Sequence, residues 1–355
     1  MNFFRSCNKR PAALSALLAA AALVAAPLAP ARAADDVVIS PQIESAVDRG
    51  LETLAKTQNA DGSWTADGAS GAATGLAVMA FMARGHVPGQ GRYGDNVSQA
   101  IDYLLSIQQG NGLFDAHGRQ MYEHGICTIA LCEAYGMLDE RRQEKARAAV
   151  SRAIRVILDA QRIPKSDPAD RGGWRYSPAA TDSDTSVTGW QLMALRGAKN
   201  IGAFLPADAI ESGIAYLKRH AVDGGGGGFS YTGRGNVTAA LTGTGVLTLI
   251  LLGDPNAPEV KAGGDYLLRT NLDSSRGGAA HYYYTLYYCS QAAWQLGGQY
   301  WTLLSRQIND SLLRRQKADG SWSEGGGTEG GQPYCTAMAI LALTVPYRYL
   351  PIYQR

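Results

Sequence analysis

The chain has 355 residues, and its 33 Lys and Arg against 31 Asp and Glu give a net charge of +2. A balance this close to neutral argues against a nucleic-acid partner. Hydrophobic residues make up 46% of the sequence and its 42 glycines lie mainly between apolar, periodic segments, which excludes a disordered chain and predicts a large buried core.

The N-terminal 33 residues have the pattern of a targeting signal. Basic residues at positions 5, 9 and 10 precede an apolar stretch over 12–29, and Ala31-Arg32-Ala33 has the small-x-small form of a cleavage site. Cleavage there removes four basic residues and leaves 29 against 31 acids, a charge of −2. The sequence therefore predicts an exported protein, periplasmic or secreted, with residues 34–355 as one domain.

A seven-residue motif marks both ends of that domain. Gln58-Asn59-Ala60-Asp61-Gly62-Ser63-Trp64 recurs as Gln316-Lys317-Ala318-Asp319-Gly320-Ser321-Trp322. Each copy follows a segment with helical apolar spacing and precedes a run rich in Ala and Leu, so the unit is predicted to be helix, glycine turn, helix. The Gln amide can bond free backbone groups at a neighbouring helix end, and the Trp can cover the joint between repeats.

Six such units follow one another in the sequence, over about 40–86, 95–138, 144–200, 206–253, 258–298 and 301–349. In the first unit, Ser40 is a predicted N-cap and Pro41 the first helical residue, and 71–84 is apolar nearly all round. The motif weakens in the middle of the chain, where its expected members are Gln108, Gln161 and Trp174, and Phe114 stands where a Trp is expected.

Threonines near the starts of the second helices share a rough spacing: Thr74, Thr128, Thr188, Thr244, Thr285 and Thr336. In each unit the first helix has a polar face and the second is mostly apolar, which favours an outer ring of helices around an inner ring. We therefore expect an all-α, (α/α)6 toroid. An open superhelix is the alternative, but matching motifs in the first and sixth units favour closure.

Four cysteines follow the predicted cleavage site, all in or at the start of apolar helical runs: Cys127, Cys132, Cys289 and Cys335. None of them makes a CxxC pair or a Cys/His pair with zinc spacing, so no metal or cofactor is expected. Buried free thiols are the simpler expectation. If export leads to a disulfide, Cys289 with Cys335 is the pair to test first, because both lie early in the second helices of adjacent units.

Gln-x-x-x-Gly-Ser-Trp turns that join helix pairs resemble those of the terpenoid cyclase and protein prenyltransferase toroids, a superfamily with prenyltransferase and squalene oxidase repeats. The likeness covers essentially the whole of 34–355. In those families the site lies in the cavity enclosed by the inner helices, near their N-terminal ends. The resemblance implies corresponding positions here at Glu123, His124, 182–184, Asn236, 281–284 and Tyr334.

The stretch Thr181 to Trp190 is similar to the segment that carries the Asp-x-Asp-Asp acid of squalene-type cyclases, where a protonated carboxyl starts a carbocation cascade. Aligned on its Asp-Thr pair and its Trp, the central acid falls on Ser183 and the last one on Asp184, with Asp182 one place away. Asp182 and Asp184 are therefore the catalytic candidates. The alternative is that these polar residues only cap the helix that follows.

Aromatic residues predict the wall of the cavity. The candidates are Trp190, Tyr282, Tyr284, Tyr287, Tyr288 and Tyr334. Their rings would give an apolar surface with polar tips, which suits an isoprenoid and can stabilise a cation. Zinc-dependent prenyl transfer is not expected, because the His of the prenyltransferase pattern falls on Tyr284 and no Asp-x-Cys pair exists.

Three functions stay open from the sequence. The first is an exported, terpene cyclase-like or mutase-like enzyme with Asp182 or Asp184 as acid, and the second is a non-catalytic toroid that binds a lipid or an exported protein partner. The third is a carbohydrate-active (α/α)6 enzyme in which carboxylates such as Glu123 and Asp182 work as acid and base across a groove. Peripheral contact with a membrane is compatible with all three.

Overall fold

The computed structural model describes residues 3–4, 39–66, 68–115, 118, 120–222, 226–233, 235–273, 281–323 and 330–354. Most of the predicted signal segment, and its cleavage site, lie outside these residues. Within the described part the chain forms helices and isolated bridges and no strand. The all-α prediction is confirmed.

Twelve α-helices alternate between two rings in the described part of the chain. The outer helices are α1 (Pro41–Thr57), α3 (Gly94–Ser106), α5 (Glu140–Arg162), α7 (Ala207–Arg219), α9 (Pro258–Arg269) and α11 (Gly298–Arg315). The inner helices are α2 (Ser70–Ala83), α4 (Gln120–Ala134), α6 (Thr185–Asn200), α8 (Ala239–Leu251), α10 (Tyr282–Leu296) and α12 (Gly331–Leu343). Short 3-10 helices follow at η1 (Tyr135–Met137), η2 (Pro168–Asp170), η3 (Val345–Tyr347) and η4 (Pro351–Tyr353).

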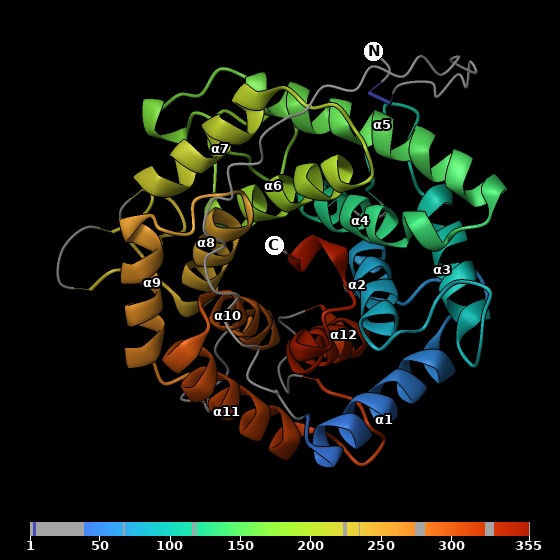
Figure 1. Cartoon of the computed structure of the whole chain (residues 1–355). Coiled ribbons are helices and arrows are strands. Elements are labelled where there is room, and N and C mark those ends of the chain that lie inside the picture. Colours follow the sequence, from blue (N-terminus) through green and yellow to red (C-terminus); the bar gives the residue numbers. More distant parts are fainter. Residues whose placement is uncertain are drawn as a thin grey trace, which may run out of the picture.

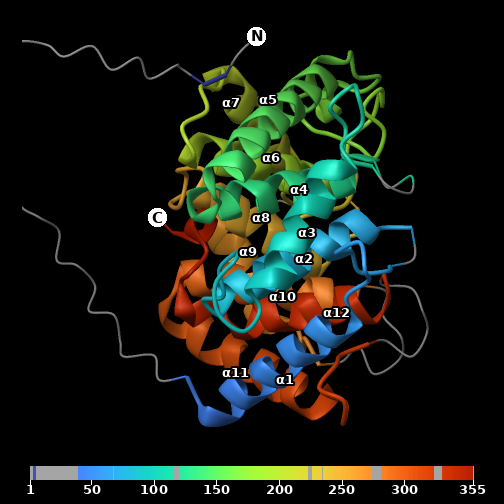
Figure 2. The ribbon, with the colours of Figure 1, turned by 90° about the vertical axis from the view of Figure 1, so that its right-hand side faces the viewer.

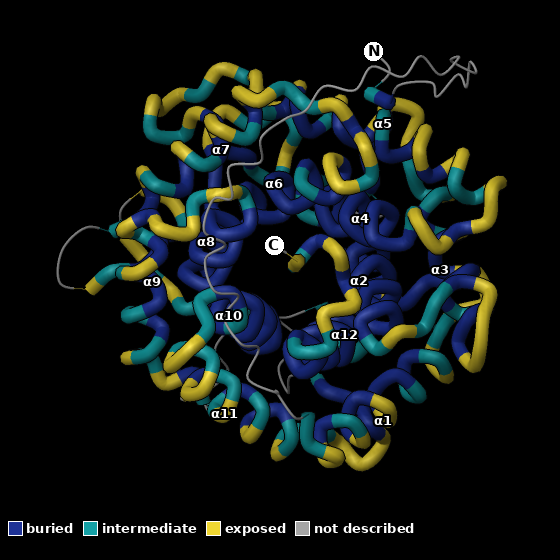
Figure 3. Tube along the Cα trace, in the orientation of Figure 1, coloured by how far each residue is buried: buried dark blue, intermediate teal, exposed yellow. Residues whose placement is uncertain are grey.

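The inner helices close into a ring (Figure 1). Each packs against its two inner neighbours in chain order, and α12 packs against α2, while α11 reaches α1 in the outer ring. The inner ring is buried and the outward side of the outer ring is exposed (Figure 3). The open superhelix is therefore excluded.

Burial follows the sequence pattern of the two helix types. In α1, Ser40 caps the helix by accepting a hydrogen bond from the Ile43 backbone N–H at 3.3 Å, Pro41 opens it, and one face is buried. In α2 all fourteen residues are buried. A helix that is apolar on every side has no face for water, so it belongs in the inner ring.

Each motif glutamine ties its own turn to the next outer helix. The Gln58 side-chain amide donates to the backbone oxygens of Gly62 and Asn96, both at 2.9 Å, and Gln108 and Gln161 repeat this arrangement. Gln316 donates to Gly320 at 2.9 Å and to Ala46 at 2.7 Å, which joins the last turn to the first helix. These bonds satisfy carbonyls that the turn and the helix would otherwise leave unpaired.

The glycine of the motif is required by close packing. Gly62 has a φ of +88°, and a Cβ placed there would lie 2.4 Å from the backbone oxygen of Gln99 in α3. No other residue type could hold this turn so close to the neighbouring helix.

The motif aromatic residues bridge the two helices of a unit. The Trp64 indole N–H donates to the Leu54 oxygen at 2.8 Å, and its backbone N–H donates to the Thr74 hydroxyl at 3.1 Å. The backbone N–H groups of later motif aromatics bond hydroxyls in the same way, in the pairs Trp174 with Thr188, Phe229 with Thr242 and Trp322 with Thr336.

The six threonines of the predicted series lie in the six inner helices, but Thr128 and Thr244 do not make this bond. In the second unit the Phe114 N–H donates to His124 Nδ1 rather than to Thr128, and in the fourth the partner is Thr242 rather than Thr244. Two predicted boundaries also shift. Asp139 caps α5, which therefore begins at Glu140 rather than near residue 144, and α11 begins at Gly298 rather than near residue 301. The four described cysteines are buried and form no disulfide, so Cys289 and Cys335 are not bonded to each other.

The C-terminal segment closes one end of the ring. Figures 1 and 2 show it on the face where the inner helices end. Arg196 in α6 donates to the Ile352 oxygen at 2.9 Å, Gln295 donates to the Tyr353 oxygen at 2.6 Å, and Glu133 accepts a hydrogen bond from the Ile352 N–H at 3.2 Å. The ring is thus plugged at this end, which leaves the N-terminal ends of the inner helices as the way in.

Candidate functional site

A cavity of about 460 Å³ lies where the inner helices begin. All six inner helices contribute a residue at or just before their first turns. Its lining residues are Ala69, Tyr122, Tyr176, Ser186, Tyr231, Asn236, Thr238, Ala240, Leu241, His281, Tyr284, Thr285, Gly330 and Tyr334. The wall therefore combines aromatic rings with a few hydroxyl and amide groups, and the described lining residues include no carboxylate.

Five tyrosines give the cavity its character. Tyr122 from α4 and Tyr334 from α12 meet across the ring with their hydroxyl oxygens 2.7 Å apart, and the Tyr122 ring stacks on Tyr176 at 6.4 Å between centroids. Burial raises the pKa of Tyr231 and of Tyr284. These phenols therefore stay protonated near neutral pH, and each can donate a hydrogen bond.

A packed aromatic cluster forms the floor beneath the tyrosines. Trp190, Tyr287 and Tyr288 are 1%, 0% and 1% exposed, and the Trp190 and Tyr287 rings are stacked at 11° with centroids 6.0 Å apart. Trp190 also contacts Tyr122 and Tyr284 of the cavity wall, while Tyr287 contacts Tyr353 of the C-terminal plug. The centre of the ring is filled at this depth, and the cavity lies above it.

Asp184 is fully buried at the start of α6. Its carboxylate caps the helix by accepting from the Val187 N–H at 2.8 Å, and its other oxygen lies 3.3 Å from an Arg175 nitrogen. Burial raises the pKa of Asp184 to about 6, against the lowering effect of the Val187 hydrogen bond and of Arg175. The side chain does not line the cavity, and both of its oxygens have partners.

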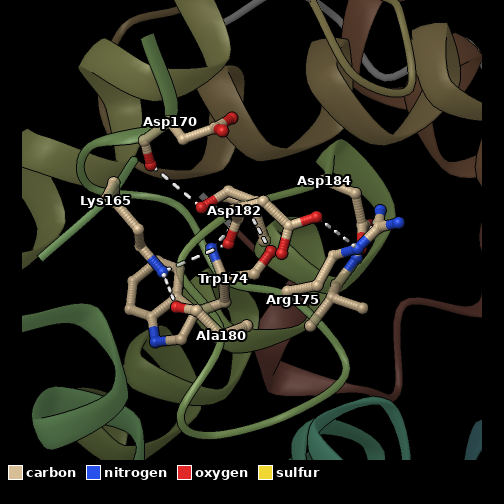
Figure 4. Close-up of polar contacts among 10 residues, drawn as sticks. Lys165, Asp170, Trp174, Arg175, Ala180, Asp182 and Asp184 are labelled. Atoms are coloured by element: carbon tan, nitrogen blue, oxygen red, sulfur yellow. Dashed lines mark hydrogen bonds and ion pairs between the residues drawn. The ribbon is translucent and has the colours of Figure 1, made fainter. Parts of the chain in front are cut away.

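Asp182 and Ser183 do not line the cavity either. Figure 4 shows Asp182 and Asp184 beside Arg175. The Asp182 side chain is 56% exposed and forms an ion pair with Arg175 at 3.2 Å. Ser183, at the position of the central acid in the cyclase pattern, is buried, and its hydroxyl donates to the Asp170 oxygen at 2.9 Å. The structure therefore does not bring Asp182 to the cavity, and Ser183 holds the turn before α6.

Arg175 links this acidic pair to the cavity wall. Its guanidinium lies over the Tyr231 ring at 5.2 Å and near the Tyr176 ring at 5.9 Å. Both tyrosines line the cavity, so the Arg175 guanidinium lies against the outer side of the aromatic wall.

Glu123 has a structural partner in the neighbouring inner helix. Its carboxylate accepts a hydrogen bond from the Ala72 N–H at 3.2 Å, and a Cβ on Gly71 would lie 2.4 Å from the same oxygen. Since α2 has no capping side chain of its own, Glu123 supplies one from α4.

His124 is fixed between two backbone groups. It accepts from the Phe114 N–H at Nδ1, 3.0 Å away, and Nε2 lies 3.1 Å from the Ala153 oxygen. Burial lowers the pKa of His124 to about 4. A neutral imidazole with a proton on Nε2 satisfies both contacts, so His124 takes the place that threonine has in other units.

Of the residues that the sequence nominates for the ligand, Tyr284 and Tyr334 line the cavity, as do Asn236 and His281. Trp190, Tyr287 and Tyr288 form the floor, and Tyr282 turns outward, where its hydroxyl bonds Ser311 of α11.

The sequence reasoning missed three cavity tyrosines. Tyr176 and Tyr231 each stand two residues after the motif aromatic of their turn, Trp174 and Phe229, and Tyr122 directly precedes Glu123. Tyr176 and Tyr231 could have been predicted from this shared position, two residues after the motif aromatic residue.

Comparisons with known proteins support the fold. No protein-family model matches the chain, and no curated protein matches it. Among solved structures, the type II terpene cyclase MstE from Scytonema matches with a TM-score of 0.59 at 14% identity, over 87% of this chain and 99% of that chain. A mannosidase of glycoside hydrolase family 76 from Bacteroides thetaiotaomicron matches with a TM-score of 0.58 at 10% identity, over 86% and 99%.

The chain has the α/α-toroid fold. A variant of MstE in complex with geranylgeranyl dihydroxybenzoate, described as its substrate, matches this toroid with a TM-score of 0.53 at 13% identity, over 87% of this chain and 98% of that chain. Identities this low establish the architecture and leave the chemistry to be argued from the site.

Two features are absent from the described residues. No helix there has both the length and the apolar character needed to span a bilayer. No group of three or more His, Cys, Asp or Glu side chains there is placed to hold a metal ion.

Proposed function

We propose that this toroid binds an apolar small molecule of the isoprenoid class in its tyrosine-lined cavity, and that it does so without acid catalysis. The observation that carries the proposal is the composition of the wall. Five tyrosines line about 460 Å³, and no described lining residue is a carboxylate. Aromatic faces bind polarisable, apolar chains, and the phenol and hydroxyl groups can bond one polar end of a ligand.

The three carboxylates nominated for catalysis support the same conclusion. Asp184 caps α6 and pairs with Arg175, Asp182 is exposed and pairs with the same arginine, and Glu123 caps α2. A general acid must reach the atom that it protonates, and a glycosidase needs two carboxyl groups flanking one bond. Neither arrangement exists among the described lining residues.

The isoprenoid class follows from the cavity together with the fold. MstE, with the same architecture, was solved with a geranylgeranyl compound. The present cavity lies in the same kind of ring and has an apolar, aromatic wall. Export of the protein, proposed from residues 1–33, would place this binding in the periplasm or outside the cell. The same proposal includes an exported protein partner that receives the ligand.

Acid-initiated cyclisation is the second candidate, and one observation favours it. Burial raises the pKa of Asp184 to about 6, and its partner Arg175 lies over Tyr231 of the cavity wall. A carboxyl with such a pKa can act as a general acid near neutral pH. A rotation of Arg175 and Tyr231 would be needed before the carboxyl could meet a ligand.

One experiment separates the two candidates. The purified chain is incubated with geranylgeraniol, and the mixture is examined by native mass spectrometry for a complex and by gas chromatography for products. Binding predicts a one-to-one complex and unchanged geranylgeraniol with both the wild type and Asp184→Asn. A cyclised product formed by the wild type and lost in Asp184→Asn would establish the enzyme instead, and the absence of any complex would contradict both.

A further inference from the structure

The deeper part of the cavity wall is buried and mostly apolar. Its side chains, each at most 8% exposed, are those of Ala69, Ser186, Ala240, Leu241, Tyr284 and Tyr334. Ser186 supplies an aliphatic hydroxyl at this depth, and it already bonds Tyr284 of the same wall. We call these six residues the deep zone. Its surface suits the chain of an apolar ligand better than a polar head.

Three exposed polar residues line the mouth of the cavity on one side. Asn236 and Thr238 precede α8, and His281 precedes α10, which packs against α8 in the inner ring (Figure 1). We call Asn236, Thr238 and His281 the mouth subsite. The cavity is therefore apolar at depth and polar on one side of its entrance.

Two members of the mouth subsite have a left-handed backbone. The φ angles of Asn236 and His281 are +56° and +71°, whereas most described residues with positive φ are glycines. A residue with a Cβ adopts this conformation at a cost in free energy. The matching position before α12 is Gly330, with a φ of +73°, and it also lines the cavity. His281 thus stands where the next unit has glycine, so the turn itself does not require its side chain.

The mouth subsite offers uncharged donors and acceptors. The Asn236 side chain makes no hydrogen bond with another described residue, so its amide can both donate and accept. Thr238 caps α8 by accepting from the Leu241 N–H at 3.2 Å, which leaves its hydroxyl proton to donate.

His281 is held in place at the entrance. Its backbone oxygen accepts a hydrogen bond from the Thr285 hydroxyl at 2.8 Å, and its ring lies edge to face against Tyr284 with centroids 6.3 Å apart. The imidazole therefore lies at the border between the mouth subsite and the deep zone.

We infer that the mouth subsite binds an uncharged, oxygen-bearing head of the ligand, a hydroxyl or a carbonyl group, while the isoprenoid chain occupies the deep zone. This inference rests on the proposed binding function and adds the class of head group and the orientation. Amide, hydroxyl and imidazole groups can bond such an oxygen. A head that entered the deep zone would give up water for few free partners, which is unfavourable, so the apolar end enters first.

Competition between matched ligands tests the inference. The purified full-length chain is mixed with equal amounts of geranylgeraniol and of the corresponding hydrocarbon, in which hydrogen replaces the hydroxyl group, and the two complexes are compared by native mass spectrometry. The wild type should favour the alcohol at least about fivefold, the effect of one or two hydrogen bonds.

Glycine variants remove the mouth side chains without straining the backbone, because glycine adopts positive φ readily. In Asn236→Gly with His281→Gly the preference for the alcohol should be lost, and Asn236→Gly alone should reduce it. Binding of the hydrocarbon should stay at the wild-type level, which shows that the fold and the deep zone are intact. Arg348→Gly is the matched control, since Arg348 has a φ of +56° and lies at the plugged end, and it should keep the preference.

The outcomes separate this inference from the proposed function. Binding of both ligands with no preference in the wild type, or with a preference that the double glycine variant keeps or Arg348→Gly also loses, would overturn the inference and leave the binding function standing. Geranylgeranyl diphosphate that displaces geranylgeraniol from an equal mixture would overturn it too, because the head would then be charged. A chain that binds none of the three compounds would contradict the proposed function and this inference with it.

Discussion

Asp184 fits two roles in the sequence, a catalytic acid and a helix N-cap, and the structure favours the N-cap. Its place in the stretch 181–190 matches the last acid of the cyclase pattern, and a carboxylate before a helix is also an ordinary N-cap. In the structure it bonds the Val187 N–H and pairs with Arg175, and it does not line the cavity. We assign it to the helix start.

The buried state of Asp184 gives a pH signature. Its pKa is about 6 in the folded protein against 3.8 for the free side chain, so the folded state binds the proton more tightly. Its contribution to stability therefore falls as pH rises from about 4 to about 6. Asp184→Asn keeps the cap and does not titrate, so its stability relative to the wild type should rise over this range, by up to about 3 kcal/mol.

Urea unfolding of the wild type and Asp184→Asn at several pH values between 4 and 7 measures this difference. The difference between the two free energies of unfolding should level off above about pH 6. A difference that does not change with pH, or that changes in favour of the wild type, would show that the carboxyl is not held in a desolvated site.

The motif glutamines offer a second prediction at the residue scale. In Gln316→Ala the backbone oxygens of Ala46 and Gly320 lose their donor, and an unpaired buried acceptor costs about 1–3 kcal/mol. We expect a loss of this size in the free energy of unfolding. Gln109→Ala is the matched control, since Gln109 is exposed and bonds only within its own turn, and its effect should stay below about 0.5 kcal/mol. Equal effects would contradict a joining role for Gln316.

At the scale of elements, the C-terminal segment closes one end of the ring and leaves the other end open. Arg196 donates to the backbone oxygens of Leu251, Ile352 and Gln354, so one side chain fastens the plug to α6 and to α8. Burial raises the pKa of Glu133 to about 8, which keeps this partner of the Ile352 N–H largely uncharged at neutral pH.

Arg196→Ala should release the plug. Three carbonyls lose a charged donor, and we expect a loss of about 2 kcal/mol or more in stability together with faster exchange of the Ile352 amide hydrogen. Hydrogen exchange measured by mass spectrometry on peptides over 345–354 reports this directly. Lys199→Ala, an exposed substitution one turn along α6, serves as control. Unchanged exchange in Arg196→Ala would mean that aromatic packing alone holds the segment.

The elements could be predicted from sequence far better than the site. The apolar character of residues 71–84 predicts a buried helix, and two copies of one turn at the ends of the domain favour a closed ring over an open superhelix. The exchange of threonine for His124 could not be foreseen, because it depends on which group reaches the Phe114 N–H in space. Tyr122 in α4 and Tyr231 before α8 line one cavity, and this depends on how the ring curves rather than on any local pattern.

At the scale of the whole molecule, the toroid is a closed cup. Helix packing joins all six units into one ring, the plug and the aromatic floor close one end, and tyrosines line the space at the other (Figures 1 and 3). The charged residues nominated for catalysis stabilise the turns and helix starts around this space. Under the proposed function the cavity is a binding site, and its apolar wall rather than an acid determines what the protein does.

Titration of geranylgeraniol by isothermal calorimetry, with a variant that fills the cavity, tests this claim most directly. Ala240 lines the cavity and the neighbouring Ala239 does not, so Ala240→Trp and Ala239→Trp are a matched pair. We predict that the wild type and Ala239→Trp bind one equivalent of ligand with similar affinity and that Ala240→Trp binds at least about tenfold more weakly, a loss of about 1.4 kcal/mol. Equal binding by both variants, or no binding by the wild type, would contradict the assignment of the cavity as the ligand site.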